Sequence, residues 1–367
     1  MLRGIYNYFY KLLPVKERKT DRTFHLLSDD EVQLIKKRER IAIWIAALLG
    51  ALGVIFLYLP YYFLPEYFPN TSISLWDYSF DIPIIFFIYV GLLVAIELFL
   101  LTLLNIWCAH EVAVLTGYIK PQTKHHPDLK RTLVNISLDK KDKSLLDYGI
   151  NPFEGLSKSA ILLRSALIIM KASLSNLVFR FIIQRVLGRY AIQVLQDFAG
   201  IPIFALWNAY GTKRILRESR VIIMGDNVVN DLVQRIKMDQ EITPEFKYLM
   251  YQTLCYVAIS KRDFHHNHYL LAKQLFDRYD LEPIDETLRK KQFLSLLSKA
   301  TTSQQEICRL IIAVGFILDG QLSTREQLRI TQMKKDGVFD FSIKEMKQFN
   351  KDFVEGKGIE AVIKKYI

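Results

Sequence analysis

A single carboxylic acid, Glu97, lies within the apolar stretch 89–107, YVGLLVAIELFLLTLLNIW. An α-helix needs about 20 residues to cross a bilayer, and the surrounding apolar run is longer than this. Ionisable residues inside such runs are rare and often functional. No Lys or Arg occurs between Arg40 and Lys120. Glu97 therefore has no basic partner within its apolar surroundings, where desolvation favours the neutral acid.

Three roles are compatible with this position of Glu97. The side chain could be a hydrogen-bonding anchor to a backbone carbonyl or to a second copy in a homo-oligomer, it could be a proton or ion site, or it could meet a basic residue from a later segment. A chain with one hairpin lacks the inverted repeats and broken helices expected of a transporter. We therefore favour the structural anchor over ion translocation.

A second group of polar residues has the spacing of part of a calcium loop. Asp319, Gly320 and Glu326 correspond to its fifth, sixth and twelfth positions, but Gly315 and Ile317 at the first and third positions supply no carboxylate. A Ser followed three residues later by Glu also begins many helices as a capping box, and Ser323 stands in that relation to Glu326. The sequence favours a capped helix over a calcium site.

Histidines form the remaining cluster with metal-binding potential. His265, His266 and His268 follow Asp263 at a predicted helix start, where we expect solvated residues of a first turn rather than metal ligands. No catalytic, phosphate-binding or dinucleotide-binding motif occurs in the chain. We therefore predict a noncatalytic protein with no metal and no cofactor.

Composition and charge indicate a membrane-associated protein. The 367 residues are 51% hydrophobic and carry a formal net charge of +11. The basic residues flank or follow apolar segments, which fits anionic lipid head groups better than nucleic acid. The three cysteines have no paired spacing, so neither a disulfide framework nor a zinc site is expected.

Two apolar runs, 41–64 and 82–107, predict a transmembrane hairpin over 41–109. Residues 1–40 contain ten Lys or Arg, whereas the intervening loop 65–81 contains none. By the positive-inside tendency, both termini are cytoplasmic and the protein is a multi-pass protein of the inner or plasma membrane. A stripe of small residues on the first span predicts close helix packing, as small residues let two backbones approach; its members are Ala42, Ala46, Gly50 and Gly53.

The segments around the hairpin have other expected roles. Residues 1–40 form a cytosolic segment with a possible interfacial helix, and 110–154 form a cytosolic linker. Residues 155–225 predict basic amphipathic helices on the membrane surface, although core helices with a solvated basic face have the same pattern. Within this region, 197–211 contains a Gly-x-Pro break that suggests a buried or re-entrant pair of half-helices. The expected contacts with lipid head groups are Arg164, Lys171, Arg185 and Arg189.

Two stretches of the chain resemble known families. The order GIPIFALWNAYGTKRILRESRVIIMG, 200–225, resembles an uncharacterised family of bacterial two-span membrane proteins. The stretch ICRLIIAVGFILDGQLSTREQLRI, 307–330, is similar to tellurite-resistance-B-like (TerB-like) helical domains, and a shifted copy at 253–276 places His268 where Glu326 stands. The second resemblance implies a helical domain with two helix-turn-helix units over 240–367.

Together these patterns predict an all-α protein with a membrane hairpin, basic surface helices and a cytosolic helical bundle. The favoured function is a noncatalytic membrane-anchored scaffold or sensor that presents its cytosolic domain to protein partners. The alternative is an oligomeric channel or transporter component that uses Glu97. Expected partners are anionic membrane lipids, cytosolic proteins and a second copy of the chain, but not nucleic acid.

Overall fold

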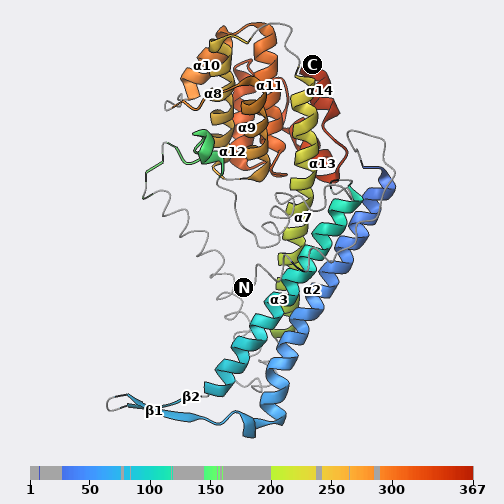
Figure 1. Ribbon diagram of the computed structural model, residues 1–367, viewed down its shortest axis with the longest axis vertical. Helices are drawn as coiled ribbons and strands as arrows, with labels where there is room; N and C mark the ends of the chain where they lie inside the picture. Colours follow the sequence, from blue (N-terminus) through green and yellow to red (C-terminus); the bar gives the residue numbers. More distant parts are fainter. Residues whose placement is uncertain are drawn as a thin grey trace. The chain divides into compact units, whose positions relative to one another are not determined.

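The structure of the protein is a computed structural model (Figure 1). It describes residues 8, 27–75, 78–82, 84–116, 118, 144–154, 156–157, 159, 200–236, 242–263, 265–284 and 290–366. The predicted interfacial helix, apart from Tyr8, and most of the predicted linker and basic amphipathic region lie outside these residues. The predicted head-group contacts Arg164, Lys171, Arg185 and Arg189 also lie outside them.

Helices dominate the described residues, which confirms the predicted all-α class. In chain order the elements are α2 (Asp29–Phe63), η1 (Pro65–Tyr67), β1 (Thr71–Leu75), β2 (Tyr78–Ile82), α3 (Ile84–Leu115), η2 (Ser144–Tyr148), α7 (Gly200–Arg235), α8 (Pro244–Lys261), α9 (His266–Tyr279), α10 (Lys290–Lys299), α11 (Thr302–Ile317), α12 (Thr324–Lys335), α13 (Ile343–Glu355) and α14 (Glu360–Tyr366).

The chain divides into two compact units. The hairpin unit contains the described parts of 1–13, 36–111 and 157–216, and the helical unit contains those of 14–35, 112–156 and 217–367. Three helices belong partly to each unit, namely α2, α3 and α7.

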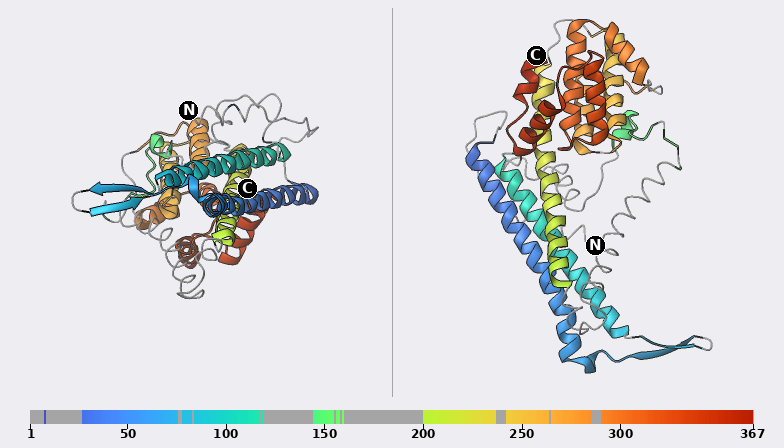
Figure 2. Two further views of the ribbon diagram at one scale, coloured as in Figure 1. Left: turned by 90° about the horizontal axis from the view of Figure 1, so that it is seen from below. Right: turned by 180° about the vertical axis from the view of Figure 1, so that it is seen from behind.

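In the hairpin unit, α2 and α3 are long and apolar enough to cross a membrane, by length and composition. The two helices run antiparallel, as two contacts between them show. Gly53 of α2 faces Glu97 of α3. One turn further along α2, the Phe56 carbonyl oxygen accepts a hydrogen bond from Tyr89, which lies two turns before Glu97 in α3. α2 starts well before its apolar run, since Ser28 and Glu31 form reciprocal hydrogen bonds at its amino-terminal end. Figure 2 shows the two helices side by side.

A β-hairpin joins these helices where the sequence analysis expected a loop. Strands β1 and β2 pair antiparallel, with Thr71 opposite Ile82 and Leu75 opposite Tyr78. Alternating polar and apolar residues are typical of strands, and 71–75 reads TSISL. The all-α prediction missed this element because each strand has only five residues.

Helix α7 differs from the predicted pair of half-helices. It is one helix from Gly200 to Arg235. Pro202 does not interrupt it, because it lies in the first turn, where the backbone N–H groups have no intrahelical acceptor. The Gly-x-Pro sequence therefore marks the beginning of a helix rather than a break within one.

The helical unit is built around α8 and α11, whose residues are largely buried. Side-chain caps begin five of its helices and explain where they start: Thr243, His265, Thr301, Ser323 and Ser342. The predicted domain start at 240 lies just after α7, but residues 217–235 of α7 already belong to this unit. Part of the predicted linker also packs here, since the ring of Tyr148 in η2 lies 4.8 Å from that of Phe276.

Candidate functional site

The hairpin unit holds Glu97 in a hydrogen bond with a residue from a third helix. The Asn208 amide nitrogen of α7 lies 2.5 Å from the Glu97 Oε1 atom of α3. An amide can donate to either the ionised or the neutral acid. Among the described residues, the hydrogen-bond partner of Glu97 is thus an asparagine side chain.

Two glycines of α2 make room for this contact. A Cβ atom on Gly53 would lie 2.9 Å from Glu97 Oε2, and one on Gly50 would lie 2.5 Å from the Phe204 carbonyl oxygen of α7. A side chain at either position would meet these atoms at a distance that native contacts avoid. Gly53 therefore lies against α3, whereas Gly50 lies against α7.

The rest of the small-residue stripe lies in the same interior. Ala42 and Ala46 have no solvent-exposed area, and Ala42 forms an apolar cluster with Cys108 and Leu216. Asn105, which follows Glu97 by two helical turns, is also buried, and its Oδ1 atom has no hydrogen-bond partner within the described part of the chain.

The outer face of this bundle is apolar. Large exposed side chains of α3 include Leu92, Leu98 and Ile96. The first turns of α7 likewise expose Leu206 and Tyr210, while their polar Asn208 points inward. Polar groups inside and apolar groups outside are the arrangement expected of helices surrounded by lipid.

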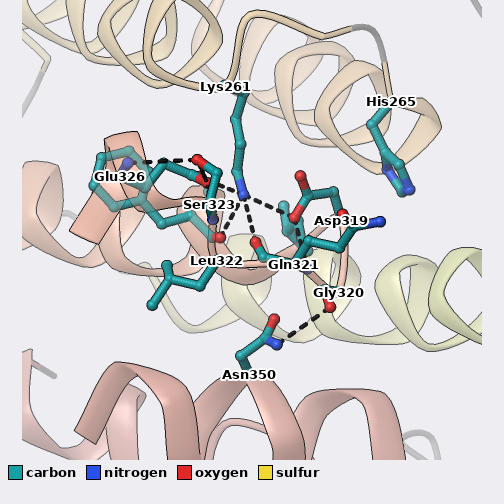
Figure 3. A network of polar contacts seen from close by, with 12 residues as sticks. Lys261, His265, Asp319, Gly320, Gln321, Leu322, Ser323, Glu326 and Asn350 are labelled. Atoms are coloured by element: carbon teal, nitrogen blue, oxygen red, sulfur yellow. Dashed lines mark hydrogen bonds and ion pairs between the residues drawn. The ribbon is translucent and has the colours of Figure 1, made fainter. Parts of the chain in front are cut away.

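The helical unit contains a second polar site, centred on Lys261 at the carboxyl-terminal end of α8 (Figure 3). Its side chain is only 2% exposed, and its ammonium nitrogen contacts four oxygen atoms. Two are carboxylate oxygens, at 2.7 Å from Asp319 and 2.5 Å from Glu326. The others are the carbonyl oxygens of Phe316, at 2.6 Å, and Gln321, at 2.9 Å.

The two carboxylates respond differently to this environment. Burial raises the pKa of Asp319, but the nearby charges of Lys261, His268 and His265 outweigh it, so the pKa lies below its usual value. Burial raises the pKa of Glu326, and attraction to Lys261 only partly opposes this rise. Ser323 further holds Glu326, because its backbone N–H and hydroxyl group both donate to Oε2.

Two helix-turn-helix units with equivalent turns meet at this site, α8–α9 and α11–α12. Arg262 and Gly320 both have left-handed backbone conformations, with φ of 55° and 67°. His265 and Ser323 both cap the following helix with a side-chain acceptor. The two units therefore share a residue with positive φ three positions before the capping residue.

The expected solvated histidines are instead largely buried, and this prediction was wrong. His268 is 5% exposed, its Nε2 atom lies 2.8 Å from the Gly315 carbonyl oxygen, and burial lowers its pKa to about 4. His265 is 9% exposed and lies 3.0 Å from Glu218 of α7. The first turn of α9 contacts α7 through His265 and α11 through His268. The sequence of α9 alone did not indicate these contacts.

Helix α7 docks directly onto this site. Arg217 donates to the Gly320 carbonyl oxygen at 2.7 Å. The buried Asn267 amide nitrogen bridges two elements, donating to Val221 of α7 at 2.9 Å and to Leu318 at 2.7 Å. The turn at Asp319 thus joins the Lys261 site to α7.

The described residues contain no group of three or more His, Cys, Asp or Glu side chains that could hold a metal ion. Asn208 and Lys261 were not predicted from the sequence. Asn208 could have been found as the single amide side chain in the apolar run 200–211. Lys261 gave no comparable indication, because a lysine in the last turn of a helix is common.

Comparison of the chain with protein-family models, with curated proteins and with solved structures finds no match. The two family resemblances therefore stay predictions.

Proposed function

We propose that this protein is a noncatalytic membrane-anchored scaffold or sensor that presents its helical unit to cytosolic protein partners. The observation that carries the proposal is helix α7, which makes specific polar contacts in both units. In the hairpin unit its Asn208 binds Glu97. In the helical unit its Arg217 binds the turn at Gly320.

The apolar helices and the charge distribution support the membrane placement. α2 and α3 each suit a membrane span by length and composition. The ten basic residues before the first span and their absence from 65–81 support cytoplasmic termini in the inner or plasma membrane. Anionic lipid head groups are the proposed partners of Arg164, Lys171, Arg185 and Arg189.

A continuous helix transmits displacement better than a flexible linker, because its backbone groups are bonded to one another along its whole length. A change at Glu97, such as protonation or assembly with a second copy, would act on α7 through Asn208. The same helix contacts the Asp319–Gly320 turn, so the helical unit would receive that change. This arrangement suits a sensor as well as an anchor.

Hydrogen exchange on the full-length protein in lipid nanodiscs tests the coupling. Asn208→Leu removes the contact with Glu97, and we expect faster exchange both in α7 and at the Asp319–Gly320 turn. Tyr210→Leu, on the exposed face of the same helix, is the matched control and should leave that turn unchanged. Unchanged exchange at the turn in Asn208→Leu would refute a sensor that works through α7.

The scaffold role is tested by affinity purification of the detergent-solubilised protein. We expect a reproducible set of cytosolic proteins that is lost when the helical unit is replaced by an unrelated soluble domain. The same set retained by the replacement protein would show that the hairpin, and not the helical unit, recruits it.

An ion pathway through an oligomer is the second candidate. It is favoured by the buried Oδ1 atom of Asn105, two helical turns after Glu97 in α3, which has no hydrogen-bond partner among the residues that the structure describes. The apolar cluster of Ala42, Cys108 and Leu216 lies one turn further along α3 and opposes a continuous polar path. Ion flux into liposomes that is abolished by Glu97→Gln would establish this candidate and displace the scaffold.

A further inference from the structure

The first turns of α7, residues 200–212, lie in the hairpin unit and contain no charged side chain. Their outer face is apolar, with Phe204 51%, Leu206 71%, Trp207 49% and Tyr210 66% exposed. At 1.5 Å per residue this stretch is about 20 Å long, whereas the hydrocarbon core of a bilayer is about 30 Å thick. The stretch is therefore too short to cross a membrane, but it is long enough to reach the middle of one.

Contacts with α2 show how deeply this stretch lies beside the first span. Leu216 clusters with Ala42, which stands at the start of the apolar run 41–64. At the other end, a Cβ atom on Gly200 would lie 3.7 Å from Val54 Cγ1, and Val54 stands just past the middle of that run. α7 thus runs antiparallel to α2 and begins opposite the middle of the first span.

We propose that the first turns of α7 are a half-span, buried among the acyl chains of the cytoplasmic leaflet and beginning near the bilayer midplane. This placement rests on the membrane location proposed above for α2 and α3. Lys213 and Arg214 are the first charged residues after the apolar stretch, and both are exposed. Their long side chains reach the anionic head groups from the edge of the hydrocarbon.

The surroundings of this face identify lipid as the group that covers it. Exposed apolar side chains of both hairpin helices lie at the same level, among them Leu48 of α2, 58% exposed, and Leu98 of α3, 60% exposed. The polar side chain of this stretch, Asn208, turns inward to Glu97. Pro202 in the first turn has no N–H group, which leaves one donor fewer to satisfy where a helix begins in hydrocarbon.

The half-span makes the membrane part of the protein asymmetric. Among the described helices, three lie in the cytoplasmic leaflet and only α2 and α3 continue into the outer leaflet. The hydrogen bond between Glu97 and Asn208 then lies inside the bilayer, where α7 shields it from lipid on one side. The protein occupies more area in the cytoplasmic leaflet than in the outer one.

Quenching of tryptophan fluorescence by brominated lipids tests this depth, because bromine quenches only at close range. The chain contains four Trp residues, so variants with a single Trp are made by changing the others to Phe. The full-length protein is placed in liposomes whose lipids carry bromine either near the head group or near the ends of the acyl chains. We expect the variant that retains Trp207 to lose more fluorescence to the bromine at the chain ends.

Two controls distinguish failure of the half-span from failure of the membrane placement. The variant that retains Trp44, 71% exposed near the cytosolic end of the α2 span, should lose more fluorescence to bromine near the head group. Leu328→Trp in the Trp-free protein, at a site 68% exposed in the helical unit, gives the quenching of a side chain outside the hydrocarbon. If Trp207 loses no more fluorescence than Leu328→Trp while Trp44 is quenched, the half-span is refuted and the hairpin stays in the membrane. If Trp44 also loses no more, the membrane placement fails with it.

Thiol labelling gives a second measurement that leaves the tryptophans in place. A maleimide reacts with the thiolate, which forms in water and not in hydrocarbon. In membranes, Leu206→Cys should therefore be labelled no more than the native protein, whose described cysteines are buried, whereas Lys213→Cys should be labelled readily. Equal labelling of the two variants would overturn the half-span.

Discussion

Replacing Gly225 with alanine is expected to weaken the docking of α7 in the helical unit, although alanine favours helices. A Cβ atom on Gly225 would lie 1.9 Å from Asn267 Nδ2 and 2.2 Å from its Cγ atom. Asn267 cannot stay in place beside such an atom. Its donations to Val221 and Leu318 would be lost together.

The expected loss can be estimated from these contacts. Two hydrogen bonds contribute about 1–3 kcal/mol in total, and a buried amide left without partners costs a further ~1–3 kcal/mol. The better helix propensity of alanine returns about 1 kcal/mol. The net loss is therefore about 1–5 kcal/mol, and each 1 kcal/mol lowers Tm by roughly 2–4 °C in a domain of this size.

Thermal unfolding of the full-length protein in detergent measures this effect. Gly211→Ala is the matched control in the same helix, because a Cβ there meets no atom within 4 Å. It should leave Tm unchanged or raise it. If Gly225→Ala is as stable as Gly211→Ala, Asn267 does not hold α7 in the way described.

Three other outcomes are expected. Glu97→Gln should preserve assembly of the hairpin, because the amide keeps a donor and an acceptor, whereas Glu97→Leu should weaken it by about 0.6–1.7 kcal/mol, as measured by the oligomeric state and unfolding in liposomes. A cysteine at Ser74 should react with an impermeant maleimide from outside intact cells and one at Ser303 should not, and the reverse pattern would contradict the topology. Above its folded pKa of about 4, His268 is neutral in the folded protein, whereas in the unfolded chain it binds a proton up to the ordinary pKa of 6.5. Stability should therefore rise as the pH rises from 4 to 6.5, and His268→Gln should flatten this dependence of the urea midpoint.

Features that depend on local pattern were predictable from the sequence. The two long apolar helices followed from uninterrupted apolar runs, and the start of α12 followed from Ser323 and Glu326, whose reciprocal hydrogen bonds are present. Both depend on residues close together in the chain. Such patterns report backbone preferences directly.

Features that depend on distant contacts were not predictable in the same way. The partner of Glu97 is more than a hundred residues away, and no periodicity connects it to Asn208. His268 was expected to be solvated because its own helix start gave no sign that Gly315 of α11 lies against it. The extent of α7 was also predicted wrongly. Pro202 lies in the first turn of α7, where a proline is tolerated, whereas a proline in a helix interior breaks or kinks the helix.

The continuity of α7 between Asn208 and Arg217 is the central claim of this account. Amide hydrogen exchange of the full-length protein in lipid nanodiscs measures it directly, because helical N–H groups exchange slowly and those of a flexible linker exchange fast. We expect slow exchange at every amide from 208 to 217. Fast exchange within this stretch would mean that a flexible joint separates the Glu97 contact from the Gly320 contact, and would contradict the proposed coupling.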